Sequence, residues 1–158
     1  MNRCFFAILC LALATALGAQ ERSSYNGSGY VYYALGAQSG ETIMGVGGGG
    51  EFLVYKGLGL GGDIGYLFPA RYASEGVGLV SVNPSYHFVN RKAPGRVVPF
   101  VTAGYAAAFR NGGVNLWNYG GGATIWVKDR LGVRLEVRDY RWEDRRFNTS
   151  VRISLAFR

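Results

Sequence analysis

Ser85 and His87 are the residues of this chain whose types and spacing could perform covalent chemistry. A serine hydroxyl becomes a nucleophile when a histidine accepts its proton and a carboxylate orients that histidine. Glu51 or Glu136 could supply the carboxylate, which would complete the residue set of an ester hydrolase. Only one residue separates Ser85 from His87, so both side chains would project from the same face of a β-strand.

The order of Ser85 and His87 in the sequence and the face on which they lie both favour a structural histidine. Enzymes that deacylate lipid A within a membrane barrel also use a serine, a histidine and an acid, but there the serine and histidine occur in the reverse order and face the lipid. Ser85 and His87 have the parity that we assign to the interior of a barrel. We therefore predict no catalytic residues and no enzymatic activity. A lipid-modifying barrel that uses Ser85 and His87 is the alternative.

The sequence predicts neither a metal nor a cofactor. His87 is the only histidine, and both cysteines, Cys4 and Cys10, lie near the N-terminus, so the usual ligands of a structural zinc are missing. Residues 45–50 match the letters of a dinucleotide-binding fingerprint, but that motif must open a helix. Residues 51–55 continue instead as a strand. We interpret these glycines as positions where a small sheet bends sharply.

Residues 1–19 have the features of a secretory signal peptide. Arg3 precedes an apolar run over residues 5–13, and small residues lead to a cleavage site near Ala19. We therefore predict an exported protein with one domain over residues 20–158. An exported chain meets little nucleic acid, so the net charge of +7 points to anionic lipids or lipopolysaccharide phosphates. A solvated basic surface without a specific partner is the alternative.

Apolar and polar residues alternate over most of the remaining chain, and a period of two predicts β-strands. The eight segments with this pattern are about 29–37, 44–55, 58–68, 77–88, 97–109, 115–127, 131–142 and 147–157. Each is close to the length of about 9–11 residues that a tilted membrane strand requires, or slightly longer. We predict an all-β fold, an eight-stranded antiparallel up-and-down transmembrane β-barrel with both termini in the periplasm.

The signal peptide, the eight strands and the C-terminal sequence VRISLAFR resemble the small, porin-like outer-membrane β-barrels of Gram-negative bacteria, such as the transmembrane domain of outer membrane protein A. The resemblance implies an outer-membrane location, a structural or interaction role at the surface, and recognition of the last strand by the outer-membrane assembly machinery. Ser150, Leu155 and Phe157 match the assembly signal of that family. Arg152 stands where the signal has glycine, and Arg158 follows the final phenylalanine.

The strand faces opposite to the apolar faces carry three acidic and three basic residues near the middle of the strands: Glu51, Asp63, Arg134, Glu136, Arg138 and Arg152. An eight-stranded barrel is just wide enough for its side chains to fill it. Charges buried there must be paired. We predict a charge-plugged, self-neutralising interior. An ion pathway is the alternative.

The faces that we assign to the outside carry aliphatic residues between two groups of aromatic residues. This pattern is typical of a wall that crosses a membrane, because aromatic side chains favour its two interfaces. We expect Tyr66, Phe68, Trp117 and Tyr119 at the outer rim, and Tyr86, Phe88, Trp126 and Phe157 at the inner rim. A soluble, lipocalin-like periplasmic barrel that binds an apolar ligand would have the reverse polarity. The two arrangements differ in whether Arg134, Glu136 and Arg138 lie inside or outside.

Several arginines fall at or near the connections that we place outside the cell. Arg110 and Arg141 have fewer acidic neighbours in the sequence than the others do. Arginine offers permanently charged, bidentate donors that suit phosphate. We therefore predict that Arg110 and Arg141 contact membrane lipid at the outer rim, and lipopolysaccharide phosphates in particular.

Overall fold

The computed structural model describes residues 27–38, 40–88, 96–110, 112–143 and 145–158, without the side chains of residues 145 and 146. The predicted signal peptide lies outside these residues. The strands are β1 (Gly27–Gln38), β2 (Glu41–Tyr55), β3 (Leu58–Pro69), β4 (Val77–His87), β5 (Val97–Phe109), β6 (Gly113–Lys128), β7 (Leu131–Trp142) and β8 (Arg145–Phe157).

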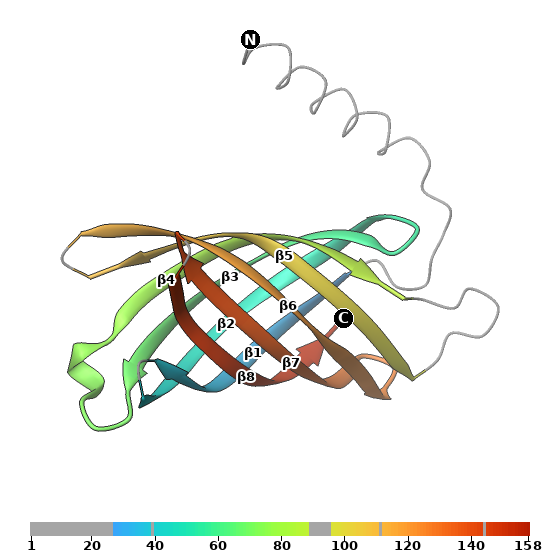
Figure 1. Cartoon of the computed structure of the whole chain (residues 1–158). Coiled ribbons are helices and arrows are strands. Elements are labelled where there is room, and N and C mark those ends of the chain that lie inside the picture. Colours follow the sequence, from blue (N-terminus) through green and yellow to red (C-terminus); the bar gives the residue numbers. More distant parts are fainter. Residues whose placement is uncertain (1–26, 39, 89–95, 111, 144) are drawn as a thin grey trace, which may run out of the picture.

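Each strand pairs antiparallel with the next, and β8 pairs with β1, so the sheet closes into an eight-stranded up-and-down barrel (Figure 1). This confirms the predicted fold class. Every predicted strand is present, with bounds that differ by at most three residues. A single 3-10 turn, η1 (Ala73–Glu75), lies in the β3–β4 connection. The described part of the chain contains no helix long and apolar enough to cross a membrane.

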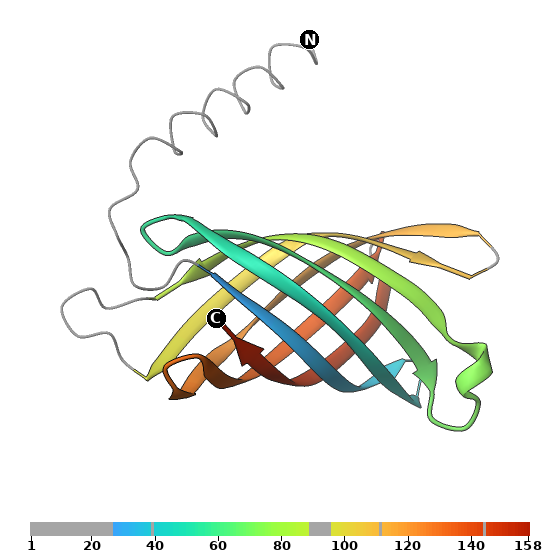
Figure 2. The same ribbon diagram turned by 180° about the vertical axis from the view of Figure 1, so that it is seen from behind.

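The two ends of the barrel can be told apart by their connections. At one end, which we call the inner end, β1 begins, β8 finishes, and two-residue turns join β2 to β3 and β6 to β7 (Figure 2). Lys56 and Gly57 form the first of these turns with φ angles of 44° and 90°, as in the tight hairpins that suit twisted strands. At the opposite, outer end, the β5–β6 hairpin and the β3–β4 connection both project from the barrel (Figure 1).

The two faces of the sheet have the predicted polarity. Leu135 on β7 points outward with 42% of its surface exposed, and the next residue, Glu136, points inward with 2% exposed. The charged side chains of Arg134 and Arg138 are buried as well. The described interior is therefore charged and the outer wall apolar, which is the reverse of a lipocalin-like arrangement.

Trp126 departs from the expected position. We expected it among the outward-facing aromatic residues of the inner rim, but it is buried inside the barrel. On β6 the outward positions near this end are Ile125 and Val127, and the pairing register with β7 shifts between Trp126 and Lys128. The indole fills the inner end of the interior together with Val98 and Tyr30.

Glycines of β2 and β3 form part of the interior wall. A Cβ on Gly49 would lie 2.7 Å from the Cβ of Asp63, and one on Gly65 would collide with the Tyr32 hydroxyl. These glycines therefore make room for side chains that project inward. The outward-facing Gly48 has more space, because its nearest neighbour would be the Tyr30 carbonyl at 3.2 Å. Curvature alone, as expected from the sequence, does not explain the interior glycines.

Candidate functional site

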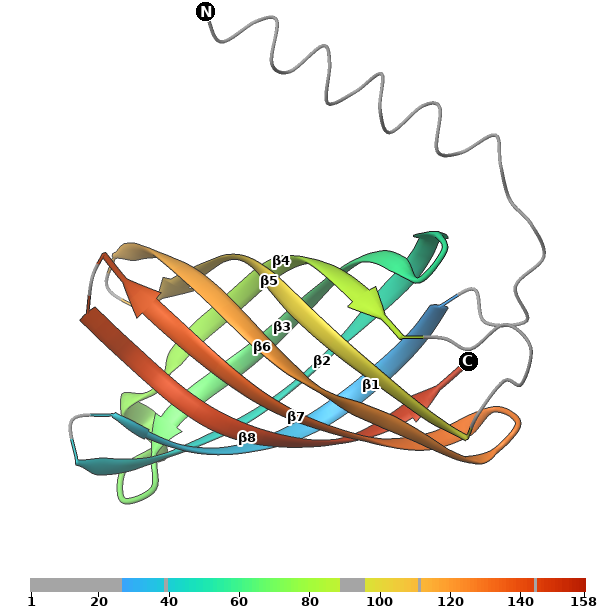
Figure 3. The ribbon, with the colours of Figure 1, turned by 45° about the vertical axis from the view of Figure 1, so that its right-hand side comes forward.

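The middle of the interior holds a charged layer, which consists of Glu51, Asp63, Arg134, Glu136, Arg138 and Arg152. All six side chains are at least nine-tenths buried. The structure thus brings together the six residues that the sequence assigned to one interior network. They come from β2, β3, β7 and β8, and Figure 3 shows β7 and β8 side by side across the front of the barrel.

Arg138 lies at the centre of the layer because it joins two carboxylates. Its Nη1 donates to Oδ2 of Asp63 at 2.9 Å, and its Nε donates to Oε1 of Glu136 at 2.6 Å. Arg152 approaches the other oxygen of Asp63 at 3.4 Å. Arg134 donates to Oε1 of Glu51 at 2.8 Å. The contacts to Asp63 and Glu51 cross the lumen, whereas Arg138 and Glu136 lie on the same strand, and the six charges balance in number.

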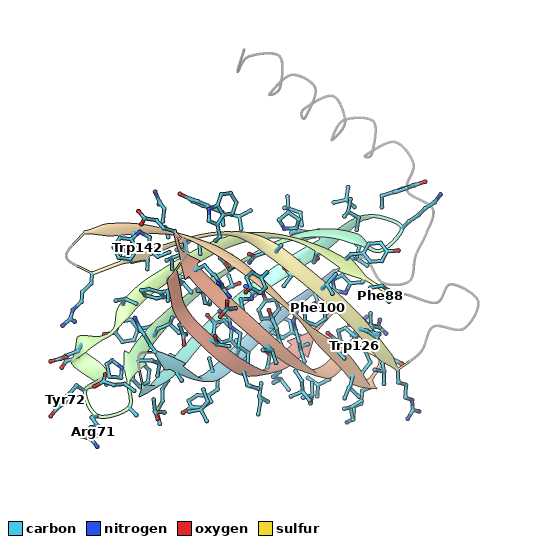
Figure 4. The ribbon with its side chains drawn as sticks, viewed as in Figure 1. Arg71, Tyr72, Phe88, Phe100, Trp126 and Trp142 are labelled. Carbon is cyan, nitrogen blue, oxygen red and sulfur yellow. The ribbon has the colours of Figure 1, made fainter. Side chains whose placement is uncertain are left out.

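Neutral residues complete the layer, and the sequence analysis did not identify them. Asp63 also accepts hydrogen bonds from Ser81 at 2.8 Å and Asn83 at 3.2 Å. Arg152 donates to the Tyr140 hydroxyl. The guanidinium of Arg134 stacks 3.7 Å from the ring centre of Phe100, which is labelled in Figure 4. The inward parity of these residues was visible in the sequence, but their partners were not.

Two apolar clusters lie on either side of the charged layer. The cluster toward the outer end consists of Ile43, Leu67, Leu79, Ala106, Ala108, Leu116 and Tyr140. The cluster toward the inner end consists of Tyr30, Tyr32, Ala34, Val98, Trp126 and Ala156. The inner end is apolar on one side only, because Ser28, Ser85 and His87 are buried there as well. No sequence motif indicated this layering.

Ser85, His87 and Glu51 meet in the interior, but not as a catalytic relay. The Ser85 hydroxyl lies 3.2 Å from Nε2 of His87, and Glu51 Oε2 lies 3.0 Å from the same nitrogen. In a relay the acid holds the opposite ring nitrogen, Nδ1, which leaves Nε2 to the serine. All three residues are buried, and Glu51 is also bound to Arg134. This geometry suits a structural histidine that is stacked on Phe100.

The two outer-rim arginines lie in different surroundings. Nε of Arg141 donates to Asp139 at 2.9 Å and to the Tyr119 hydroxyl at 3.1 Å. Arg141 therefore has an acidic partner, Asp139, two residues before it on β7. Arg110 donates to the backbone carbonyl of Glu75 in the β3–β4 connection at 2.9 Å.

These two arginines do not form one site. Arg141 pairs across from Trp117, which in turn pairs with Tyr105 on β5. Arg110 follows Phe109, four residue pairs further along the same hairpin. At about 3.4 Å per residue, the two positions are separated by about 14 Å or more along the strands. Each arginine must therefore be considered as a separate contact.

Within the described residues, no group of three or more histidine, cysteine, aspartate or glutamate side chains is arranged to hold a metal ion. The charged layer is made of carboxylates that arginines already occupy. The interior of the described chain is therefore a packed ionic network.

No family model and no curated protein matches the sequence. The fold does match solved structures. The N-terminal β-barrel domain of Pseudomonas aeruginosa OprF has a TM-score of 0.62 at 13% identity, over 82% of this chain and 96% of that chain. Neisserial surface protein A has a TM-score of 0.56 at 14% identity, over 87% and 97%.

A barrel from the de novo design of transmembrane β-barrels also matches, with a TM-score of 0.57 and 21% identity over 87% of this chain and 98% of the designed one. Natural and designed membrane barrels thus share this architecture at low sequence identity. The likeness shows the fold: this chain is a closed eight-stranded β-barrel of the kind found in small outer-membrane proteins.

Proposed function

We propose that the protein is a non-enzymatic β-barrel of the bacterial outer membrane. The observation that carries the proposal is the inverted polarity of the wall, with arginines and carboxylates inside and large apolar side chains outside. Phe52, Ile64 and Trp117 are exposed to 77%, 62% and 64%. Soluble proteins rarely expose contiguous apolar patches beyond a few hundred Å². A lipid bilayer is the environment in which such a wall is stable.

Aromatic pairs near both ends support a bilayer orientation. Tyr105 and Trp117 pack edge to face with ring centres 5.6 Å apart toward the outer end, and Tyr86 and Phe88 pack similarly at 5.1 Å toward the inner end. Aromatic side chains favour the level of the lipid headgroups. The apolar band between them would span the hydrocarbon.

The layered interior supports a structural or interaction role at the cell surface. Two apolar clusters enclose a neutralised charged layer, so the described part of the barrel resembles a filled core rather than a conduit. The N-terminal domain of OprF and neisserial surface protein A have a similar barrel fold, which supports the proposal. We further propose that the assembly machinery recognises β8, which ends at the exposed Phe157.

Cell fractionation tests the proposal directly. We expect the protein in the outer-membrane fraction, soluble only in detergent, and we expect the folded barrel to migrate differently from the boiled form on a gel. A lysate in which the protein is released in the soluble periplasmic fraction without detergent would contradict the membrane assignment.

We also propose that Arg110 and Arg141 contact lipopolysaccharide phosphates from the outer leaflet. Asp139 and Tyr119 hold Nε of Arg141, and that restraint leaves the two terminal guanidinium nitrogens available to a phosphate. Substituting both arginines with Gln should reduce the lipopolysaccharide that copurifies with the barrel, while folding in neutral detergent stays unchanged. If the double variant retains the same lipid and the same lipid-dependent melting shift, this part of the proposal is wrong.

A further inference from the structure

The described connections are short, so the ends of the barrel offer little loop surface to a partner. The two ends differ instead in their charged side chains. Among described side chains, the outer end mixes the basic Arg71, Arg110 and Arg141 with the acidic Glu41, Glu75, Asp139 and Glu143. The inner end has Lys56, Arg96, Lys128, Arg130 and Arg158, and within the described ranges Asp129 is the only acidic side chain among them. The inner end is therefore strongly basic, whereas the outer end is nearly balanced.

Four of these basic residues form a continuous group, which we call the basic arc: Arg96, Lys128, Arg130 and Arg158. Backbone hydrogen bonds connect its parts. The Trp126 amide donates to the Arg96 carbonyl at 2.7 Å, and the Arg158 amide donates to the Arg130 carbonyl at 3.2 Å. The start of β5, the β6–β7 turn and the end of β8 are therefore held together at one side of the inner end.

Three charges of the arc are available to a ligand. Arg96, Lys128 and Arg130 are exposed, and no ion pair joins them to an acidic residue in the described part of the chain. Arg158 packs with its guanidinium 4.4 Å from the ring centre of Trp126, and its Nε donates to the backbone carbonyl of Asp129 at 2.6 Å. Its side chain is thus held in place beside the β6–β7 turn and supports the other three.

Apolar residues lie immediately next to the arc on the outer wall. Val97, Val127, Leu131 and Phe157 are each 40–60% exposed and follow or precede the arc residues on the same strands. Figure 4 places Trp126 and Phe88 at this end, opposite Arg71, Tyr72 and Trp142. Permanent positive charge thus borders an exposed apolar band, as is expected where hydrocarbon meets headgroups.

We propose that the basic arc binds the headgroups of anionic phospholipids in the periplasmic leaflet, an inference that rests on the proposed membrane location. The arginines offer bidentate donors to a phosphodiester, and Lys128 adds a point charge. Basic residues near an anionic lipid surface each stabilise attachment, and the effect decays over a Debye length. The arc would fix the depth of the barrel and strengthen its inner end beside the two-residue turn that joins β6 to β7.

The test compares urea unfolding in phosphatidylcholine vesicles with and without phosphatidylglycerol. In such vesicles both ends of the barrel face the same lipid mixture. A difference between variants therefore comes from the end of the barrel that carries the substitution and not from an asymmetry of the lipids. We expect phosphatidylglycerol to raise the ratio of folded to unfolded wild-type protein. The double substitution Lys128→Gln and Arg130→Gln should reduce that gain by about twenty-five-fold, because each basic residue near an anionic lipid surface strengthens attachment about fivefold and two are removed.

Two matched variants act as controls. Arg71→Gln removes an exposed charge at the outer end, where acidic residues balance the basic ones, and should leave the phosphatidylglycerol gain nearly unchanged. Asp129→Asn removes the acid within the arc and should increase the gain. High salt should abolish the difference between wild type and the double variant, because the Debye length falls to about 3 Å at 1 M. An unchanged gain in the double variant, or an equal loss in Arg71→Gln, overturns the inference.

The same variants distinguish a lipid site from a failed membrane assignment and from a cell-wall site. If the wild-type protein does not fold into phosphatidylcholine vesicles at all, the proposed membrane function itself has failed. If detergent-solubilised wild type sediments with peptidoglycan, the double variant does not, and the phosphatidylglycerol gain is equal in both, the arc binds the cell wall and the lipid assignment is wrong.

Discussion

Asp63 is the residue whose removal the interior would tolerate least. Its two oxygens accept contacts from Arg138 and Arg152 on the far wall and from Ser81 on the neighbouring strand. A buried charge that loses its partner costs far more than the pair contributes when it is intact. The ionic layer is therefore a set of mutually dependent charges rather than a sum of separate salt bridges.

Asp63→Asn should lower the free energy of unfolding by about 3–5 kcal/mol, because two buried guanidinium groups would lose a carboxylate. Urea unfolding in neutral lipid vesicles measures this difference. Asp129→Asn, in an exposed turn, is the matched control and should change stability by less than about 0.5 kcal/mol. Equal effects at the two positions would mean that the interior network does not stabilise the barrel.

At the scale of the strand, β2 allows its two faces to be compared at adjacent positions. Gly49 faces the interior, where a Cβ would lie 2.9 Å from the Cα of Asp63, and Gly48 faces outward with more open space. Gly49→Ala should destabilise the barrel by about 1–3 kcal/mol through overpacking. Gly48→Ala should be close to neutral or slightly stabilising, because alanine reduces the entropy of the unfolded chain. Thermal unfolding in detergent, monitored by gel shift, ranks the two variants.

The outward face of β7 offers a second comparison. Leu135 pairs with Ile153 on β8, and both are exposed on the apolar band. If this band lies at the midplane of a bilayer, Leu135→Arg should destabilise the inserted barrel by about 2–4 kcal/mol. Leu131→Arg, at the inner end of the same strand, should cost about 0–1 kcal/mol because the guanidinium reaches the headgroups.

Urea titration in vesicles measures both arginine variants. Ser154 on β8 is not a suitable control, since it is buried in the interior beside Arg134, where an added arginine would overpack the lumen. A cost that does not depend on position along β7 would argue against a membrane-embedded wall.

At the scale of the whole molecule, side chains from several strands fill the interior with both ion pairs and apolar contacts. The charged layer lies between two apolar clusters, one of which includes Leu79 and Leu116 and the other Val98 and Trp126. An ion that crossed the lumen would have to displace apolar side chains and break buried ion pairs. We therefore expect a closed barrel for two physical reasons, packing and neutralisation.

Purified protein should give no large, long-lived, ohmic conductance in planar lipid bilayers, because an eight-stranded barrel is filled by its own side chains. A large porin in the same bilayer is the positive control. Stable channels from the wild-type protein would overturn the closed interior and favour the ion pathway.

The sequence by itself determined the strands, the parity of their faces and the set of charges that share the interior. Period-two alternation is a local property, so segments such as residues 131–142 could be assigned without knowledge of their neighbours. For the same reason, the inward direction of Glu51, Asp63 and Arg138 could be predicted. The structure brings these residues together as that parity requires.

Only the tertiary structure decided which groups meet across the lumen. Arg138 and Asp63 are 75 positions apart and touch because the closed barrel sets the register of β7 against β3. The same closure places Glu51 and Ser85 on one nitrogen of His87, which removes the catalytic relay that the residue types suggested. Trp126 is a different case, because its inward direction follows from plain alternation with the outward-facing Ile125 and Val127. The sequence of each strand determines whether a side chain points inward or outward. The height of that side chain within the barrel depends on how all eight strands are staggered.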